Sequence, residues 1–315
     1  MLVLEQVFPR HKVTGGIGMQ AGLRELAVQV SRIAEDAGKH ALKDQLMPKD
    51  LVTLNTVQRD YSRGLKVDDR LSQFIYNRLT YIDPFKGRWE DRTDEWAPGD
   101  RYWCVGGVDG VINYSRSMAE WSVTISLFEF NEFGSAQPIL GVIHAPALNL
   151  TYLAARQQGA IRMRNTPVGE KREKIMPSTI SHLDGSIVSF GMSYVPQEAQ
   201  HALNVVASLA GKPADIKRIG PVSLDVCKVA DGTYDAYFEP HLHERDVPAI
   251  SAAAVVLWEA QGQLSTWEGG LIHWRSQNDL VATNGQIIQE LQPYLINSDC
   301  GESYHHHEQK PAGQQ

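Results

Sequence analysis

One short segment constrains the fold of this chain more than any other. Residues 103–114 read Trp-Cys-Val-Gly-Gly-Val-Asp-Gly-Val-Ile-Asn-Tyr, a largely apolar run interrupted by Asp109 and Gly110. An apolar run that ends in Asp-Gly predicts a buried strand that turns sharply into a helix. Asp109 is therefore expected at a strand-to-helix turn, where its side chain could either cap the helix or face a ligand.

The pattern on both sides of this segment predicts a layered α/β protein. Apolar residues recur at helical spacing from Gly22 to Ala37, and again after Asp68 or Asp69, either of which could cap the second helix. Short β-rich segments then follow at 101–105, 121–130, 139–144, 150–155 and 160–163. The second half mixes helices and strands, with helices near 199–210, 224–230, 249–260 and 286–295 and strands at 234–238, 262–266 and 280–283.

The same pattern predicts how the chain is divided. We expect an N-terminal arm over residues 1–20 and one domain over 21–296. Its N-terminal lobe would run over about 21–180 and its C-terminal lobe over about 181–296. The polar stretch 297–315, which contains Pro, Gly and Gln, is expected to be a disordered tail.

Composition excludes several functional classes. The 315 residues are 43% hydrophobic and 21% charged, as in ordinary globular proteins. The net charge of −7 disfavours a nucleic-acid-coating surface, and no apolar run approaches the length of a membrane span. The N-terminus lacks a signal peptide, and the widely spaced Cys104, Cys227 and Cys300 suit free thiols in a reducing compartment. We therefore expect a cytoplasmic protein without a nucleic-acid or membrane partner.

Residues 103–114 resemble the metal-binding turn of the inositol monophosphatase superfamily. Three further blocks resemble the family in the same order: the Asp-Leu-Val-Thr motif at 50–53, the segment 139–160 and the segment 218–239. The resemblance covers roughly residues 23–295. It implies an α/β/α/β/α sandwich, often a homodimer, that hydrolyses phosphate monoesters with magnesium.

The resemblance also implies where magnesium would bind. Asp109, the carbonyl of Val108, Asp246 and Glu90 correspond to metal ligands, and magnesium prefers such hard oxygen donors. Asp69 would help to position a water. Each has a simpler interpretation: Asp246 and Asp69 could cap helices, and Glu90 could be a solvated loop carboxylate, since Asp94 and Glu95 compete for its role.

Substrate contacts follow from the same resemblance. The backbone N–H groups of Gly110 and Val111 would bind phosphate at a helix N-terminus. Glu239 would contact the alcohol part of the substrate, although it could also be a surface charge at a strand end. The sequence disfavours a fructose-bisphosphatase-type activity, because it shows no second basic phosphate pocket. Lys217 and Arg218 could serve as one, but two adjacent charges are weak support.

Three substitutions distinguish this chain from the family pattern. Gly106 stands where the family carries an Asp that holds two metals, and Val111 stands where a Thr hydroxyl orients the attacking water. Thr56 occupies a further position where an Asp is normal. Loss of a carboxylate weakens binding of several ions, and loss of one preorganised polar group can cost about 10²–10³ in rate. We therefore expect fewer magnesium ions than the family norm.

Two functional hypotheses remain open. The first is an atypical Mg²⁺-dependent phosphomonoesterase acting on an inositol, sugar or nucleotide phosphate. The second is a catalytically impaired pseudoenzyme that binds a phosphorylated ligand or a protein partner. A repurposed biosynthetic enzyme is a variant of these, with His241, His243 or Glu244 recruited as new ligands.

Overall fold

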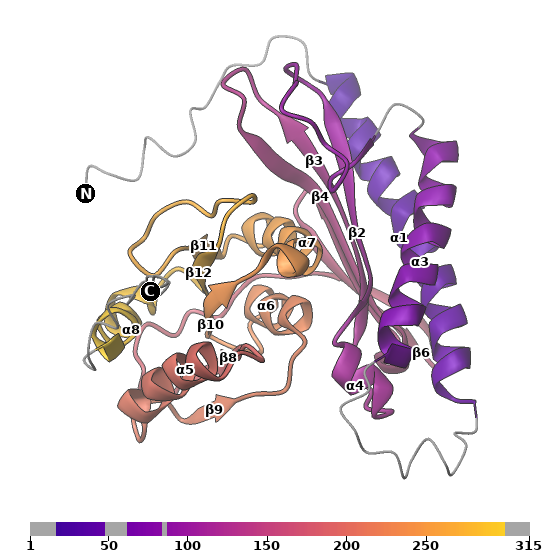
Figure 1. Ribbon diagram of the computed structural model, residues 1–315. Helices are drawn as coiled ribbons and strands as arrows, with labels where there is room; N and C mark the ends of the chain where they lie inside the picture. Colours follow the sequence, from indigo (N-terminus) through magenta and orange to yellow (C-terminus); the bar gives the residue numbers. More distant parts are fainter. Residues whose placement is uncertain (1–16, 48–61, 84–86, 300–315) are drawn as a thin grey trace, which may run out of the picture.

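The computed structural model describes residues 17–47, 62–83 and 87–299. In these ranges, two β-sheets alternate with three layers of helices (Figure 1). Helices α1 (Ile17–Gln45) and α3 (Ser62–Ile82) cover the outer face of the first sheet. This arrangement confirms the expected α/β/α/β/α sandwich.

The first sheet is an almost continuous meander. Its seven described strands lie in chain order, with β1 parallel to β2 and every later neighbour antiparallel. The strands are β1 (Gly87–Arg88), β2 (Arg101–Asp109), β3 (Ser122–Phe130), β4 (Ala136–Ala145), β5 (Leu150–Ala155), β6 (Ala160–Thr166) and β7 (Gly169–Lys174). The short helix α4 (Val111–Ser115) follows β2 directly.

The second sheet has the strand order β11-β12-β10-β8-β9. Its strands are β8 (Ile187–Phe190), β9 (Asp215–Lys217), β10 (Ala236–Leu242), β11 (Gln263–Ser265) and β12 (Asn278–Thr283). Helices α5 (Pro196–Leu209) and α8 (Ile288–Ile296) pack on its outer face. The short 3₁₀ helices are η1 (Pro146–Leu148), η2 (Glu244–Asp246) and η3 (Asn297–Asp299).

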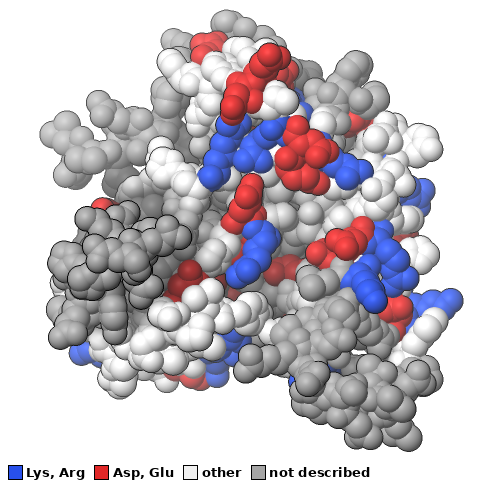
Figure 2. Space-filling model, viewed as in Figure 1, with Lys and Arg blue, Asp and Glu red and all other residues white. Residues whose placement is uncertain are grey.

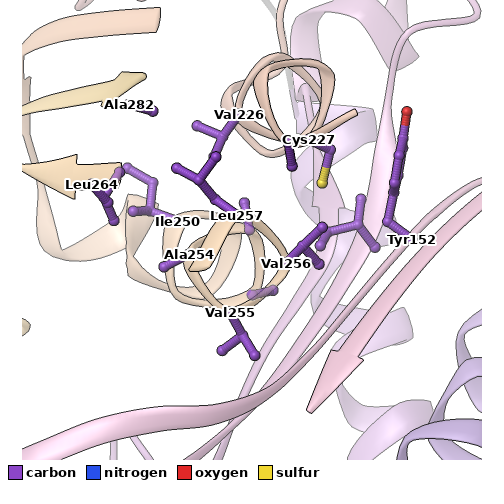
Figure 3. Packing of buried hydrophobic residues seen from close by; sticks show 14 of the residues in the cluster. Tyr152, Val226, Cys227, Ile250, Ala254, Val255, Val256, Leu257, Leu264 and Ala282 are labelled. Atoms are coloured by element: carbon purple, nitrogen blue, oxygen red, sulfur yellow. The ribbon is translucent and has the colours of Figure 1, made fainter. Parts of the chain in front are cut away.

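Helices α6 (Val222–Ala230) and α7 (Val247–Glu259) form the middle layer between the two sheets. Figure 3 shows their apolar side chains packed together, with Leu264 and Ala282 of the second sheet on one side and Tyr152 of the first on the other. The helix α7 lies so close to β4 that a Cβ at Gly141 would overlap the carbonyl oxygen of Ala252. The middle layer is therefore fixed against the first sheet by direct backbone contact.

Several elements differ from those expected. Helix α3 begins at Ser62, so Asp68 and Asp69 lie inside it and the expectation that either caps it is wrong. The cause is Val67, which extends the buried face formed by Leu71 and Ile75 one turn earlier. Strands β7, β8 and β9 were not expected from the sequence pattern.

The chain ends are only partly described. Helix α1 begins at Ile17, inside the segment expected to be an irregular arm, and residues 297–299 form η3 rather than part of a disordered tail. The remainder of both segments, and Thr56 with the 50–53 motif, lie outside the described residues. Within the described ranges, no helix combines the length and apolar character needed to cross a membrane.

Candidate active site

Asp109 is the last residue of β2, and Gly110 turns the chain into α4. Gly110 has a φ of +88°, and a Cβ there would lie 3.2 Å from the Cβ of Pro221 and 3.3 Å from the carbonyl oxygen of Glu120. Glycine is therefore required by both conformation and space. Gly110, not Asp109, occupies the N-cap position of α4, so the helix-capping interpretation of Asp109 is wrong.

The carboxylate of Asp109 is held by helix α6 of the middle layer. Its Oδ2 accepts a hydrogen bond from the backbone N–H of Ser223, in the first turn of α6, at 3.1 Å. The Ser223 hydroxyl in turn lies 2.8 Å from that of Ser122 on β3. Burial raises the pKa of Asp109 to about 6, against the hydrogen bonds from Ser223 that lower it. Asp109 makes no ion pair with a described Lys, Arg or His side chain.

Two further acids act electrostatically on Asp109. The charges of Asp246 and Asp68 both raise its pKa, so folding brings three carboxyl groups from α3, β2 and η2 into one neighbourhood. Asp246 is half-buried, and its Oδ2 accepts a hydrogen bond from the backbone N–H of His243 at 3.0 Å. Burial raises the pKa of Asp246 as well. Asp246 stands at the N-cap position of α7, but its side chain makes no capping hydrogen bond to that helix; its role as a metal ligand stays a prediction.

Glu239 is the fourth member of this group, which we call the acid cluster (Asp68, Asp109, Glu239 and Asp246). Burial raises the pKa of Glu239 to about 8, and the charges of Asp246 and Asp109 add to the effect. The Tyr237 hydroxyl donates a hydrogen bond to Glu239 Oε2 at 2.7 Å. A Cβ at Gly191 would lie 2.6 Å from Glu239 Cδ, so only glycine leaves room for this side chain.

Asp68 was missed by the sequence analysis, which chose its neighbour Asp69. Asp68 Oδ1 accepts a hydrogen bond from the Val108 backbone N–H at 2.8 Å, whereas Asp69 is exposed. A Cβ at Gly107 would lie 2.8 Å from Asp68 Oδ1, so the close approach of α3 to β2 depends on this glycine. The apolar residue Val67 could have shown this from the sequence. If Val67 belongs to the buried face of the helix, then Asp68 lies beside that face and Asp69 points away from it.

Glu90 lies apart from the acid cluster. It follows β1, which ends alongside Trp103, six residues before Asp109 on β2. The Tyr76 hydroxyl donates a hydrogen bond to Glu90 Oε2 at 2.9 Å. Its charge raises the pKa of Tyr76 and Cys104 and is not among the main influences on Asp109. Its role as a ligand stays a prediction.

Gly106, where the family carries a carboxylate, could take a side chain only if Thr124 moved. A Cβ there would lie 2.6 Å from Thr124 Oγ1 and 3.3 Å from Pro248 Cβ. Within the described ranges, no three His, Cys, Asp or Glu side chains converge closely enough to hold a metal ion together. Asp109 and Asp246 supply the kind of hard oxygen donors that magnesium prefers, and their role as ligands stays a prediction.

The histidines considered as recruited ligands have other partners. His243 Nε2 lies 2.8 Å from Glu198 Oε2, which ties η2 to the first turn of α5. His241 Nδ1 lies 3.4 Å from Gln277 Nε2, and burial lowers the pKa of His241. Glu244 is exposed. The structure supplies no shared metal position for these three side chains.

The sequence of this chain is similar to those of known proteins. Residues 2–299 match the inositol monophosphatase family. Nus factor SuhB of Xylella fastidiosa is 27% identical over 263 residues, which cover 81% of this chain and 89% of that protein. Histidinol-phosphatase of Streptomyces coelicolor is 25% identical over 268 residues, which cover 85% of this chain and 96% of that protein.

Solved structures agree on the fold. The inositol monophosphatase from Anabaena (Nostoc) superposes with a TM-score of 0.70 at 21% identity, covering 88% of this chain and 96% of that chain. Mycobacterium tuberculosis SuhB superposes with a TM-score of 0.69 at 20% identity, covering 88% and 98%. At this identity the likeness concerns the fold alone.

Proposed function

This chain belongs to the inositol monophosphatase family, and from that premise we propose that it hydrolyses the phosphate monoester of a small metabolite with a single Mg²⁺ ion. The observation that supports the proposal most directly is the acid cluster around Asp109. Burial is the main cause of the raised pKa values of Asp109 and Glu239, and the charge of Asp246 adds to both, while Asp109 has no ion pair with a described basic side chain. A buried carboxyl group such as Asp109, beside other acids and without an ion-pair partner among the described residues, suits a site completed by a cation.

Each group has a role in this proposal. Asp109, Asp246 and the Val108 carbonyl would hold Mg²⁺, which would neutralise the charge that develops on the phosphoryl oxygens. The backbone N–H groups of Gly110 and Val111 would bind phosphate oxygens. Ser223 fixes the orientation of Asp109 through the 3.1 Å hydrogen bond described above.

Glu239 would recognise the alcohol part of the substrate. With a pKa of about 8 it keeps its proton at neutral pH, so it can donate as well as accept a hydrogen bond. Glu90 and Asp69 stay weaker candidates, because one accepts from Tyr76 and the other is exposed. Asp68 replaces Asp69 as the α3 carboxylate we assign to the site.

The test is release of inorganic phosphate from a panel of inositol, sugar, nucleotide and histidinol phosphates, with and without Mg²⁺. We expect Asp109→Asn to lower kcat/KM by about 10³ or more, because it removes the negative charge of a proposed metal ligand. Asp69→Asn is the matched control and should retain activity. Turnover that survives in Asp109→Asn, or that ignores Mg²⁺, would contradict the proposal.

A second candidate function is a catalytically impaired protein that binds a phosphorylated ligand or a protein partner. The blocked position at Gly106 and the relative named Nus factor SuhB favour it. Its signature is calorimetric binding of phosphorylated metabolites with no phosphate release anywhere in the panel. Three expectations stay predictions under either function: a cytoplasmic location, a homodimer and no binding of nucleic acid. Sedimentation tests the homodimer, and a nucleic-acid binding assay tests the third.

A further inference from the structure

The carboxylate of Asp246 has one close hydrogen-bond donor among the described residues. Its Oδ2 accepts a hydrogen bond from the backbone N–H of His243 at 3.0 Å. Its Oδ1 lies 3.9 Å from Nε of Arg245, whose side chain is 60% exposed, so this ion pair is weak. The side chain of Asp246 makes no capping hydrogen bond to α7. The direction of this carboxylate therefore depends mainly on how His243 is held.

His243 is held at both nitrogens of its ring. Nε2 lies 2.8 Å from Glu198 Oε2. The ring also accepts a hydrogen bond from the backbone N–H of Asp246, which completes a reciprocal capping box between the two residues. Since Nε2 faces the carboxylate of Glu198, Nδ1 is this acceptor, and Nε2 carries the proton and donates it to Glu198. Glu198, His243 and Asp246 thus form a chain of hydrogen bonds from α5 to the acid cluster.

Glu198, where this chain begins, is itself well anchored. It lies in the first turn of α5, where the helix dipole favours an acid. The Ser193 hydroxyl donates a hydrogen bond to its carboxylate, and Gln277 Nε2 lies 3.5 Å from its Oε1. The helix α5 packs on the core of the second sheet through buried residues that include Val205 and Leu209. The position of Glu198 is therefore set by the fold of the C-terminal lobe.

Neither apolar packing nor surface charge replaces these hydrogen bonds. The turn η2 lies between the buried Leu242 and Val247, but none of its own residues is buried. On the face shown in Figure 2, acidic side chains lie beside basic ones rather than in a patch of one sign. Surface charge there gives cations no general attraction, so a cation site depends on how its own ligands are held.

We propose that Glu198 and His243 are positioning residues, which hold the Asp246 carboxylate in the direction that a bound Mg²⁺ requires. Carboxylates that bind metals are oriented by such hydrogen-bonded partners, and loss of a partner weakens metal binding about 10- to 100-fold. This inference rests on the proposed function, because it takes Asp246 as a ligand. It gives α5 a part in the site, although no residue of α5 belongs to the acid cluster.

The test measures the Mg²⁺ dependence of phosphate release in Glu198→Ala and Glu198→Gln. In Glu198→Ala, we expect the Mg²⁺ concentration for half-maximal activity to rise about tenfold or more, because the His243 ring loses its anchor. At saturating Mg²⁺, kcat should change by less than about threefold, since added cation restores occupancy. Glu198→Gln keeps an acceptor oxygen for His243 Nε2 and should recover most of the wild-type Mg²⁺ affinity.

A double-mutant cycle links Glu198 to His243. His243→Ala keeps the backbone N–H that binds Asp246 but removes the ring, so it should weaken Mg²⁺ affinity about as much as Glu198→Ala. Residues that act through one chain are not additive, and the double variant should be no weaker than either single variant. Losses of Mg²⁺ affinity that multiply in the double variant would contradict the chain.

Glu290→Ala is the matched control. Glu290 lies on α8, and its Oε1 is 2.6 Å from His182 Nδ1, so the variant removes a second glutamate–histidine pair that contacts no proposed ligand. Its Mg²⁺ dependence should equal that of the wild type. A purely structural role for Glu198 would lower Tm and kcat and leave the Mg²⁺ concentration for half-maximal activity as it is. That result would overturn the inference.

Calorimetry with Mg²⁺ in the absence of substrate separates failure of this inference from failure of the proposed function. Phosphate release by the wild type, with unchanged Mg²⁺ dependence in Glu198→Ala, would leave the hydrolase and remove the positioning role. Mg²⁺ binding that weakens in both Glu198→Ala and Asp246→Asn, with no phosphate release from any substrate, would remove the hydrolase and keep the positioning role. A wild type that binds no Mg²⁺ and releases no phosphate would overturn both.

Discussion

Two clusters of buried acids in this molecule are built in opposite ways. Asp231, with a side chain only 1% exposed, accepts hydrogen bonds from the Tyr152 hydroxyl at 2.8 Å and from Arg162 at 2.5 Å, and Arg162 also binds Glu173. We call this group the paired cluster (Tyr152, Arg162, Glu173 and Asp231). In the acid cluster, burial raises the pKa of every member, and the charges of other members raise those of Asp109 and Glu239 further.

The difference indicates which cluster serves the fold and which serves a ligand. The paired cluster satisfies its charges internally, so it needs nothing from solution. The acid cluster keeps carboxyl groups buried and close together at a cost to stability, which folding alone does not require. Three changes of decreasing size test this contrast.

The largest effect on stability should come from Arg162→Met. Removal of the guanidinium leaves the Asp231 carboxylate buried without its cation, and we expect the free energy of unfolding to fall by about 3–5 kcal/mol. Chemical denaturation measures the loss. Arg164→Met on the same strand, where the side chain is exposed, should change it by less than about 0.5 kcal/mol. An equal loss in both variants would contradict the role of the paired cluster.

A medium effect is expected when the family carboxylate is restored. Gly106→Asp places a side chain against Thr124 Oγ1 and adds charge to the acid cluster, so it should destabilise by about 1–3 kcal/mol. Thr124→Ala in the same protein should recover part of the loss and let Mg²⁺ raise Tm further than in the wild type. A fully stable Gly106→Asp single variant would show that the position is not closed.

The smallest effect has the opposite sign. The pKa of Glu239 is about 8 in the folded protein and near 4.5 when unfolded, so the folded state keeps a proton that the unfolded state releases. Stability therefore falls as pH rises between these values. In EDTA, Glu239→Gln should stabilise by about 1–2 kcal/mol at pH 9 and change little at pH 4, as measured by Tm.

Glu173 in the paired cluster is the control for that comparison. Lys171 and Arg162 lower the pKa of Glu173, so its contribution to stability is present at neutral pH and is lost as pH falls. Glu173→Gln should therefore destabilise near neutral pH and lose its effect in acid. The same pH trend in both variants would remove the distinction between the clusters.

Local sequence information was enough for part of this picture. The turn at Asp109 and Gly110 and the family blocks after residue 100 predicted the sandwich, because each depends on neighbouring residues. Strand β7 was missed because its six residues are mostly exposed and charged. Asp68 was missed because the start of α3 was placed at a possible N-cap residue, Asp68 or Asp69. The buried Val67 shows that the helix starts earlier.

Other features depend on contacts between distant segments. The closed position at Gly106 is created by Thr124 and Pro248, and the anchoring of Asp109 comes from Ser223. The pKa of Glu239 depends on Asp246 and Asp109 together. No spacing rule along the chain encodes these distances, since they arise only when both sheets and the middle layer are assembled.

The contact between Gly141 and Ala252 has a consequence for how the metal site can change. Asp246 stands just before α7, and Ala252 lies six residues later, about 9 Å along the helix axis. One added methyl group at Gly141 would push the whole helix away from β4. Such a substitution would therefore increase the distance between Asp109 and Asp246, the two proposed magnesium ligands, without contacting either. The size of the cation that the site prefers would then depend on a residue that takes no part in the reaction.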